Sequence, residues 1–468
     1  MRCGRNGLGC SRFVAAFGAC VAFGAVSAAW AEETGLDQYV AAPDPSYSWN
    51  VVQTIREPGM TTFVVDLKSQ TWRSPDDVDR PLWQHWLLIA RPDGAQAGTG
   101  LLFIGGGRNG REAPSKPDER VTQLARGSQS VVASLMMVPN QPLVFHNDGQ
   151  PRVEDDLIAY TWTQFLKTGD PTWPARNAMV KSAVRAMDTI TALLASEQGG
   201  RLQVDKFVVA GGSKRGWTTW ITGAVDKRVV AIAPLVIDVL NVQPSMRRHY
   251  AAYGFWAPAV GDYTRHKIFQ HIGTPEMEAL EKLVDPYYYR DRLTMPKFIM
   301  NAAGDQFFLP DSSQFYFDDL PGEKYLRYVP NTDHSLDESD AVESLLAFYL
   351  TVLHNTPRPV MTWTFEDDGA IRVSSQTPVA KAVLWQATNP AARDFRVETL
   401  GRSYRGAELH PDSAGAYVGR VTPPQTGWTA YYIELTYDIG QRVPLKLSTA
   451  VRVTPDTLPF ADKDPAAE

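Results

Sequence analysis

The sequence predicts an α/β fold built on a mostly parallel sheet, because continuous apolar runs alternate with segments of helical periodicity. Leu101-Leu102-Phe103-Ile104 and residues 130–135 are such runs, typical of strands that helices cover on both faces. Apolar residues at helical spacing predict a helix over residues 175–196, and Gly199-Gly200 ends it. This alternation is typical of a doubly wound α/β domain.

The remaining elements of this domain follow from the same two patterns. Residues 61–67 and 84–90 alternate in polarity and predict antiparallel opening strands, whereas residues 32–60 look irregular. We expect further parallel strands at 206–210, 229–237, 297–301 and 324–329, and helices at 156–167, 216–225 and 340–353. The aromatic-rich stretch 239–292 interrupts the alternation, so we interpret it as an inserted cap.

Helical patterning stops after Pro357 and Pro359. Short strand candidates then follow at 362–365, 370–374, 379–386, 394–399, 417–421, 430–437 and 445–453. This pattern is typical of a β-sandwich of immunoglobulin type. We therefore expect an α/β domain at residues 32–357 and a C-terminal β-sandwich domain at 358–468.

The N-terminus has the features of a signal peptide at residues 1–31. Three arginines precede an apolar run at 13–26, and Ala29-Trp30-Ala31 fits a cleavage site. The run is too short to span a bilayer. These features predict export to the periplasm or the medium, and a lipid anchor on Cys20 is the second alternative.

All three cysteines lie in this leader. Its removal changes the net charge from −6 to about −9, because the remaining chain has 43 basic and 52 acidic residues. This negative net charge argues against nucleic acid as a partner.

A sharp turn between a strand and a helix carries the strongest chemical signal. The segment Val209-Ala210-Gly211-Gly212-Ser213 ends an apolar strand, and Gly216 lies three residues beyond the serine at the start of a helix. Such a turn exposes a serine hydroxyl above the sheet, and the nearby glycines allow the helix to approach the strand. The alternative is a helix capped by an ordinary Gly/Ser turn.

Two further residues favour the interpretation of Ser213 as a catalytic nucleophile. Asp305 and His334 each follow a predicted parallel strand, so we expect both at the sheet edge that carries Ser213. The chain order serine, acid, histidine is that of the α/β-hydrolase fold, in which the imidazole accepts the serine proton and the carboxylate orients the imidazole. Asp238 follows the preceding strand and is an alternative acid.

The same geometry suggests where a substrate would bind. We expect the oxyanion hole to use the backbone N–H of Lys214 and of Gly106, which lies in the glycine run after residues 101–104. Arg215, Trp217 and Trp256 are candidate substrate-binding residues. The leader-free chain has no cysteine, and His266 and His271 lack the spacing of a helical zinc pair. We therefore predict no metal and no cofactor.

Three segments resemble one known family closely. These are the segment from Gly211 to Trp220, Gly304-Asp305-Gln306-Phe307-Phe308-Leu309-Pro310-Asp311 and Pro330-Asn331-Thr332-Asp333-His334-Ser335. They resemble the PhoPQ-activated pathogenicity-related protein family over nearly the whole leader-free chain. The resemblance implies an exported α/β-hydrolase-like protein with a poorly defined substrate, and it allows an extracellular protein-binding role. The Ser-x-x-Gly turn is also similar to that of glucuronoyl esterases.

These observations predict an exported serine esterase that acts on a small-molecule or carbohydrate ester through an acyl-enzyme. Two alternatives stay open. The first is a non-catalytic secreted effector or binding protein that keeps the fold, since fold alone does not define function. The second is a serine peptidase. The oligomeric state does not follow from the sequence.

Overall fold

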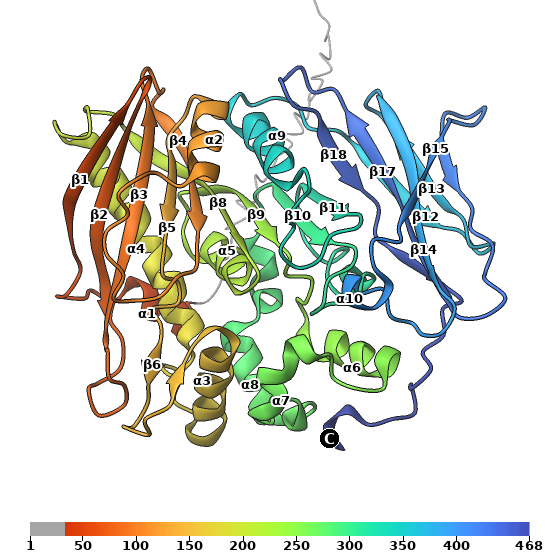
Figure 1. Cartoon of the computed structure of the whole chain (residues 1–468), viewed down its shortest axis with the longest axis horizontal. Coiled ribbons are helices and arrows are strands. Elements are labelled where there is room, and N and C mark those ends of the chain that lie inside the picture. Colours follow the sequence, from red (N-terminus) through yellow and green to blue (C-terminus); the bar gives the residue numbers. More distant parts are fainter. Residues whose placement is uncertain (1–32, 468) are drawn as a thin grey trace, which may run out of the picture. The chain divides into compact units, whose positions relative to one another are not determined.

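The structure, a computed structural model, describes residues 33–467, so the predicted signal peptide lies outside the described residues. Its main sheet has 14 strands, of which 13 follow the order β1-β2-β3-β5-β4-β8-β9-β10-β11-β18-β17-β14-β15, with β19 paired to β17 (Figure 1). These strands are Ser48–Glu57 (β1), Met60–Thr71 (β2), Leu82–Pro92 (β3), Gly98–Ile104 (β4), Val132–Leu135 (β5), Val204–Gly212 (β8), Val229–Leu235 (β9), Lys297–Ala302 (β10), Lys324–Val329 (β11), Lys381–Asn389 (β14), Arg405–Leu409 (β15), Trp428–Tyr437 (β17), Leu445–Ser448 (β18) and Arg452–Thr454 (β19).

The six strands from β5 to β11 in this order are parallel, and the strands on either side of them pair antiparallel. Helices cover both faces of the parallel part. Helices α4 (Ala175–Ala195) and α5 (Lys214–Val225) contribute to one apolar cluster, and α2 (Glu119–Ser128) and α9 (Ala341–Leu353) contribute to the other. The predicted α/β-hydrolase fold is therefore confirmed. Within the described residues no helix combines the length and the apolar character that a bilayer span requires.

The predicted cap contains three helices near the carboxyl ends of the parallel strands: α6 (Val242–Tyr253), α7 (Gly261–Arg265) and α8 (Pro275–Val284). Thr274 caps α8 by accepting a hydrogen bond from Met277 N, and Pro275 fixes its first turn. Helix α3 (Glu154–Thr168) packs against α7 and α8 (Figure 1). Residues of α3, α6 and α7 line the cavity next to Ser213.

The C-terminal strands form two sheets. Strands β14, β15, β17 and β18 continue the main sheet, because Leu326 of β11 pairs with Ser448 of β18. Strands β12 (Met361–Phe365), β13 (Ile371–Ser375) and β16 (Tyr417–Gly419) form a second sheet. Apolar residues of β13 and β17 share one cluster, as expected for packed sheets. A domain boundary at residues 357 and 358 stays a prediction.

Three local expectations were wrong. Residues 32–60 contain α1 (Gly35–Ala41) and β1, which were missed because α1 spans two turns and β1 is a half-exposed edge strand. Residues 394–399 do not form a strand, since the Arg396 guanidinium bonds back to Asp394 and α10 (Val397–Leu400) follows. Residues 445–453 form two strands, because at Thr449 the side-chain hydroxyl accepts from Ile433 N and interrupts the regular backbone pairing with β17.

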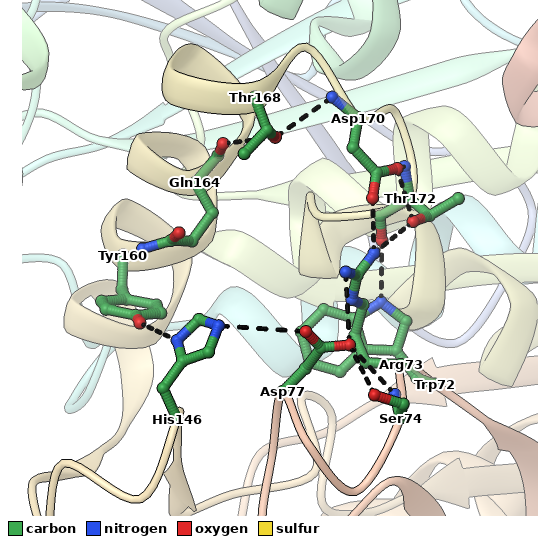
Figure 2. Close-up of polar contacts among 10 residues, drawn as sticks. All are labelled: Trp72, Arg73, Ser74, Asp77, His146, Tyr160, Gln164, Thr168, Asp170 and Thr172. Atoms are coloured by element: carbon green, nitrogen blue, oxygen red, sulfur yellow. Dashed lines mark hydrogen bonds and ion pairs between the residues drawn. The ribbon is translucent and has the colours of Figure 1, made fainter.

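A polar cluster fixes the connection between α3 and α4 (Figure 2). Arg73, in the β2–β3 connection, donates to Asp170 at 2.8 Å, and Trp72 Nε1 donates to the Thr172 carbonyl at 3.1 Å. On α3, the Tyr160 hydroxyl lies 3.0 Å from His146 Nδ1. These contacts tie the β2–β3 connection to the residues directly before α4, and so position the first turn of that helix.

Candidate active site

Ser213 occupies the tight turn between β8 and α5. Its backbone has φ 58° and ψ −128°, a sparsely populated conformation for a residue with a side chain, and its N–H donates to Leu235 O of β9. A Cβ on Gly216 would lie 2.9 Å from the carbonyl oxygens of Gly211 and Leu235, so only glycine lets α5 pack this closely. This geometry is that of a nucleophile elbow.

Asp305 and His334 lie on the loops that follow β10 and β11. His334 Nδ1 is 2.8 Å from Asp305 Oδ2 and 3.0 Å from Oδ1. The Asp305 side chain is 4% exposed, and it also accepts a hydrogen bond from Phe307 N. His334 Nε2 is buried, and within the described residues it has no hydrogen-bond partner. The imidazole is therefore held at one nitrogen and free at the other.

Asp238, the alternative acid, has different partners. It accepts hydrogen bonds of 2.6 Å from the hydroxyls of both Tyr316 and Tyr328. Burial raises the pKa of Asp238 to about 7, although the two tyrosine hydroxyls favour its ionised form. The carboxylate that contacts the His334 imidazole is that of Asp305.

Ser213 lines a small cavity, and His334 packs against a residue of its wall. The cavity has a volume of about 50 Å³, and its lining includes Ser213 and Phe307. The Phe307 ring centroid lies 4.3 Å from that of His334. Within residues 33–467 no hydrogen bond joins the Ser213 hydroxyl to His334, and such catalytic bonds are often long in unliganded enzymes.

Most of the cavity wall is apolar. Lys214 and Trp217, both predicted near the substrate, line it together with Asp155, Trp162, Arg176, Ile237, Val239, Val242, Met246, Val260, Tyr263, Phe269, Phe307 and Phe308. Trp256 stacks on Phe269 at 3.8 Å and so packs against a wall residue. A larger hollow of about 730 Å³ beside β11 and β12 contains none of Ser213, Asp305 and His334 in its lining.

An ionic cluster lies beside the elbow. Lys214 Nζ is 2.8 Å from Glu154 Oε2 and 3.1 Å from Asp155 Oδ2. Arg215 donates to both carboxylate oxygens of Glu154. Burial opposes the charge on Glu154, but the hydrogen bond from Arg215 and the charges of Lys214 and Arg215 outweigh it, lowering the pKa of Glu154 to about 2. Both cations therefore have carboxylate partners.

The Gly105-Gly106-Gly107 loop lies next to the elbow. Ile104 of β4 pairs with Gly211 of β8 in parallel register, so the residues that follow the two strands are neighbours. A Cβ on Gly106 would lie 2.7 Å from Arg215 Nη2, so the guanidinium packs directly against this glycine. Gly106 N–H has no acceptor within the described residues, and Lys214 N–H, as the first of α5, has no intrahelical acceptor. Two backbone donors are thus available near Ser213.

Sequence reasoning missed three charged residues of this site: Glu154, Asp155 and Arg176. The acidic pair lies at the start of α3, where carboxylates are common for reasons of helix stability alone. Arg176 lies in the first turn of α4 with no motif around it. No sequence signal distinguishes these residues from surface charges, because their partners lie far along the chain.

The fold and the elbow place the chain among proteins of the α/β-hydrolase fold. A family model described as PhoPQ-activated pathogenicity-related protein matches residues 36–396, and the chain belongs to this family. The autocrine proliferation repressor protein A of Dictyostelium discoideum is 38% identical over 462 residues, which cover 91% of this chain and 92% of that protein.

Esterases are found among the structural neighbours. Acetyl xylan esterase 1 from Thermoanaerobacterium sp. JW/SL YS485 is 13% identical, with a TM-score of 0.47 over 68% of this chain and 93% of the esterase. A glucuronoyl esterase from Solibacter usitatus is 14% identical, with a TM-score of 0.37 over 67% of this chain and 89% of the esterase.

Proposed function

We propose that the protein is an exported serine hydrolase that cleaves carboxylic esters through an acyl-enzyme. The contact between His334 and Asp305 carries the proposal, because it leaves His334 Nε2 free at the sheet edge where the strained Ser213 lies. A hydroxyl becomes a competent nucleophile only when a base accepts its proton, and an oriented imidazole is such a base.

In the proposed reaction, Ser213 Oγ attacks the ester carbonyl carbon while His334 Nε2 accepts the hydroxyl proton. Asp305 holds the imidazole and stabilises its positive charge. The N–H groups of Gly106 and Lys214 donate to the oxyanion that forms on the carbonyl oxygen. The alcohol leaves with the proton from His334, and water then attacks the acyl-enzyme by the same route, which releases the acid and restores Ser213.

Hydrolysis of a panel of esters with acyl chains of different length tests this proposal. We expect the leader-free protein to hydrolyse at least one ester and the Ser213→Ala variant to lose at least 10³-fold in kcat, about the loss seen when triad members are removed. Equal activity of the two proteins would show that hydrolysis arises elsewhere. Amides of the same acids, run in parallel, separate an esterase from a peptidase.

A non-catalytic secreted effector is the second candidate. The relative that is 38% identical is named for repression of proliferation, which favours a protein that acts by binding. A fold of this kind does not by itself require catalysis. Retained biological activity of Ser213→Ala would support the effector role, whereas loss of that activity in a folded variant would tie the effect to hydrolysis.

A further inference from the structure

Arg176 is a buried cation in the wall of the Ser213 cavity, and no carboxylate of residues 33–467 lies within ion-pair distance of it. The residue is 2% exposed, and within the described residues no ion pair involves its guanidinium. Nη2 donates to the Tyr263 hydroxyl at 3.3 Å. In the part of the chain that the structure describes, Nε and Nη1 are buried without an acceptor, which leaves three N–H groups unused. Native proteins rarely leave buried donors of a charged group unsatisfied.

The neighbouring carboxylates are already engaged. Asp155 accepts a hydrogen bond from Tyr263 at 3.0 Å and pairs with Lys214 at 3.1 Å. Glu154 pairs with both Lys214 and Arg215. Lys214 and Arg215 thus neutralise Glu154 and Asp155. The charge of the buried Asp285 also favours the protonated form of Arg176, but its carboxylate accepts hydrogen bonds from Val242 N and Tyr287 N, and within the described residues it forms none with the guanidinium.

The guanidinium is held in place. Its central carbon lies 3.8 Å from the ring centroid of Trp217 and 5.4 Å from that of Trp162. Trp217 is fixed in turn, because its Nε1 donates to Val284 O. Arg176 also lies in the first turn of α4, directly after the segment that the cluster of Figure 2 anchors. A rigid donor with one face stacked and its N–H groups unused is preorganised to bind an anion.

The cavity also limits the size of that anion. A group the size of a water molecule needs roughly 10–15 Å³ of cavity volume. The cavity volume of about 50 Å³ therefore accommodates roughly three to five non-hydrogen atoms. A CH₂–carboxylate group has four such atoms and a CH₂–CH₂–carboxylate group has five. Longer chains meet the apolar wall formed by cap residues such as Val242, Met246 and Phe269.

We propose that Arg176 binds the carboxylate of a short acyl group whose other end is the ester carbonyl attacked by Ser213, so that the preferred substrates are hemiesters of short dicarboxylic acids. This proposal rests on the proposed function, since it names the acyl class of that reaction. The apolar walls contact the methylene groups, and the N–H groups of Arg176 contact the carboxylate.

Binding to the Ser213→Ala variant tests the anion site without turnover. Calorimetric titration compares malonate with malonamide, which has the same size and no charge. We expect malonate to bind at least about tenfold more tightly than malonamide, because a buried charged donor discriminates strongly against a ligand that lacks the matching group. Arg176→Met in this background should abolish the difference, Arg176→Lys should retain part of it, and Arg185→Met, on the same helix but paired with Asp188, should retain all of it.

Kinetics on the wild-type protein give the second readout. We expect kcat/KM for a malonyl hemiester to exceed that for the isosteric 3-methylbutanoyl ester at least about tenfold, and Arg176→Met to reverse the order. Equal binding of malonate and malonamide overturns the anion site, even if neutral esters are hydrolysed. Malonate binding that depends on Arg176, with no ester hydrolysed, leaves the anion site standing and overturns the proposed function instead.

Discussion

Arg215 donates hydrogen bonds of 2.7 and 2.8 Å to the two carboxylate oxygens of Glu154, which joins the first turn of α5 to the first residue of α3. The same guanidinium donates from Nε to Val138 O at 2.6 Å and packs against Gly106. One side chain therefore connects the elbow helix, the loop after β5 and the glycine loop that we propose donates to the oxyanion. Neither Arg215 nor Glu154 lines the Ser213 cavity, so this ion pair lies behind the cavity wall.

Replacing Glu154 with glutamine should weaken this connection. An amide cannot satisfy Lys214 and Arg215 as a carboxylate does, but the Glu154 side chain is 41% exposed and solvent screens part of the effect. We expect a loss of about 1–2 kcal/mol in the free energy of unfolding and a fall of about tenfold in ester turnover, as Gly106 shifts. Denaturant melts and initial rates measure the two effects.

Glu278→Gln is the matched control, because Glu278 pairs with Lys282 on the exposed face of α8. It should change the free energy of unfolding by about 0.5 kcal/mol or less and leave turnover unchanged. Similar behaviour of the two glutamine variants would mean that the Glu154 ion pair does not support the site.

A methyl group on Gly106 should disturb the proposed oxyanion loop directly. In Gly106→Ala the new Cβ would overlap Arg215 Nη2, so either the guanidinium or the loop must move. We expect kcat to fall by about 10²-fold, the scale of losing one oxyanion donor. Gly261→Ala, where a Cβ meets open space, should keep full turnover. Unimpaired turnover in Gly106→Ala would remove Gly106 from the mechanism.

Sequence patterns located the candidate residues that follow strands and failed where partners come from separate helices. The positions of Ser213, Asp305 and His334 could be predicted because each follows a recognisable apolar strand and parallel strands share one carboxyl edge. The cluster of Glu154, Asp155 and Lys214 could not, since the cation lies some 60 residues beyond the carboxylates and the start of α3 has no capping side chain to mark it. Pairing across such a distance is set by packing, which local patterns do not encode.

The same limit explains the errors in the fold. Apolar residues at helical spacing predicted the range of α4 closely, but not that 16 of its 21 residues, including all of residues 175–184, are buried. By contrast, β1 is an edge strand whose ten residues are all partly or fully exposed, so little apolar patterning remains to be recognised. Residues 394–399 contain alternating polar and apolar residues, but the bond between Arg396 and Asp394 replaces strand pairing there.

The two candidate acids should separate cleanly by mutation. We expect Asp305→Asn to lower kcat by about 10³–10⁴-fold with little change in melting temperature, because an amide cannot stabilise the His334 imidazolium. Asp238→Asn should retain at least a tenth of the activity, since its partners are Tyr316 and Tyr328. The opposite order of the two losses in steady-state assays would reassign the acid to Asp238.

Asp238 should instead affect the pH dependence of stability. Burial raises its pKa to about 7 in the folded state, against about 3.9 in an unfolded chain. Between these values the folded protein keeps a proton that the unfolded chain releases, so this group lowers stability as pH rises from 4 to 7, by about 1.4 kcal/mol per pH unit.

The Asp238→Asn variant has no carboxyl group at this position that could bind or release a proton. Its free energy of unfolding, relative to the wild type, should therefore increase as pH rises from 4 to 7 and level off above 7. Urea melts of both proteins at matched pH values measure the difference, and other titrating groups cancel because both proteins contain them. Parallel curves over this range would show that Asp238 is ionised in the folded protein throughout.

Covalent labelling with a fluorophosphonate tests the central claim most directly, since such probes react only with a serine hydroxyl that a neighbouring base activates. Intact-mass and peptide mass spectrometry should find one adduct per chain, on Ser213, with no adduct in folded Ser213→Ala and greatly slowed labelling in His334→Ala. A folded wild-type protein that stays unlabelled, or an adduct on a serine other than Ser213, would contradict the proposed site.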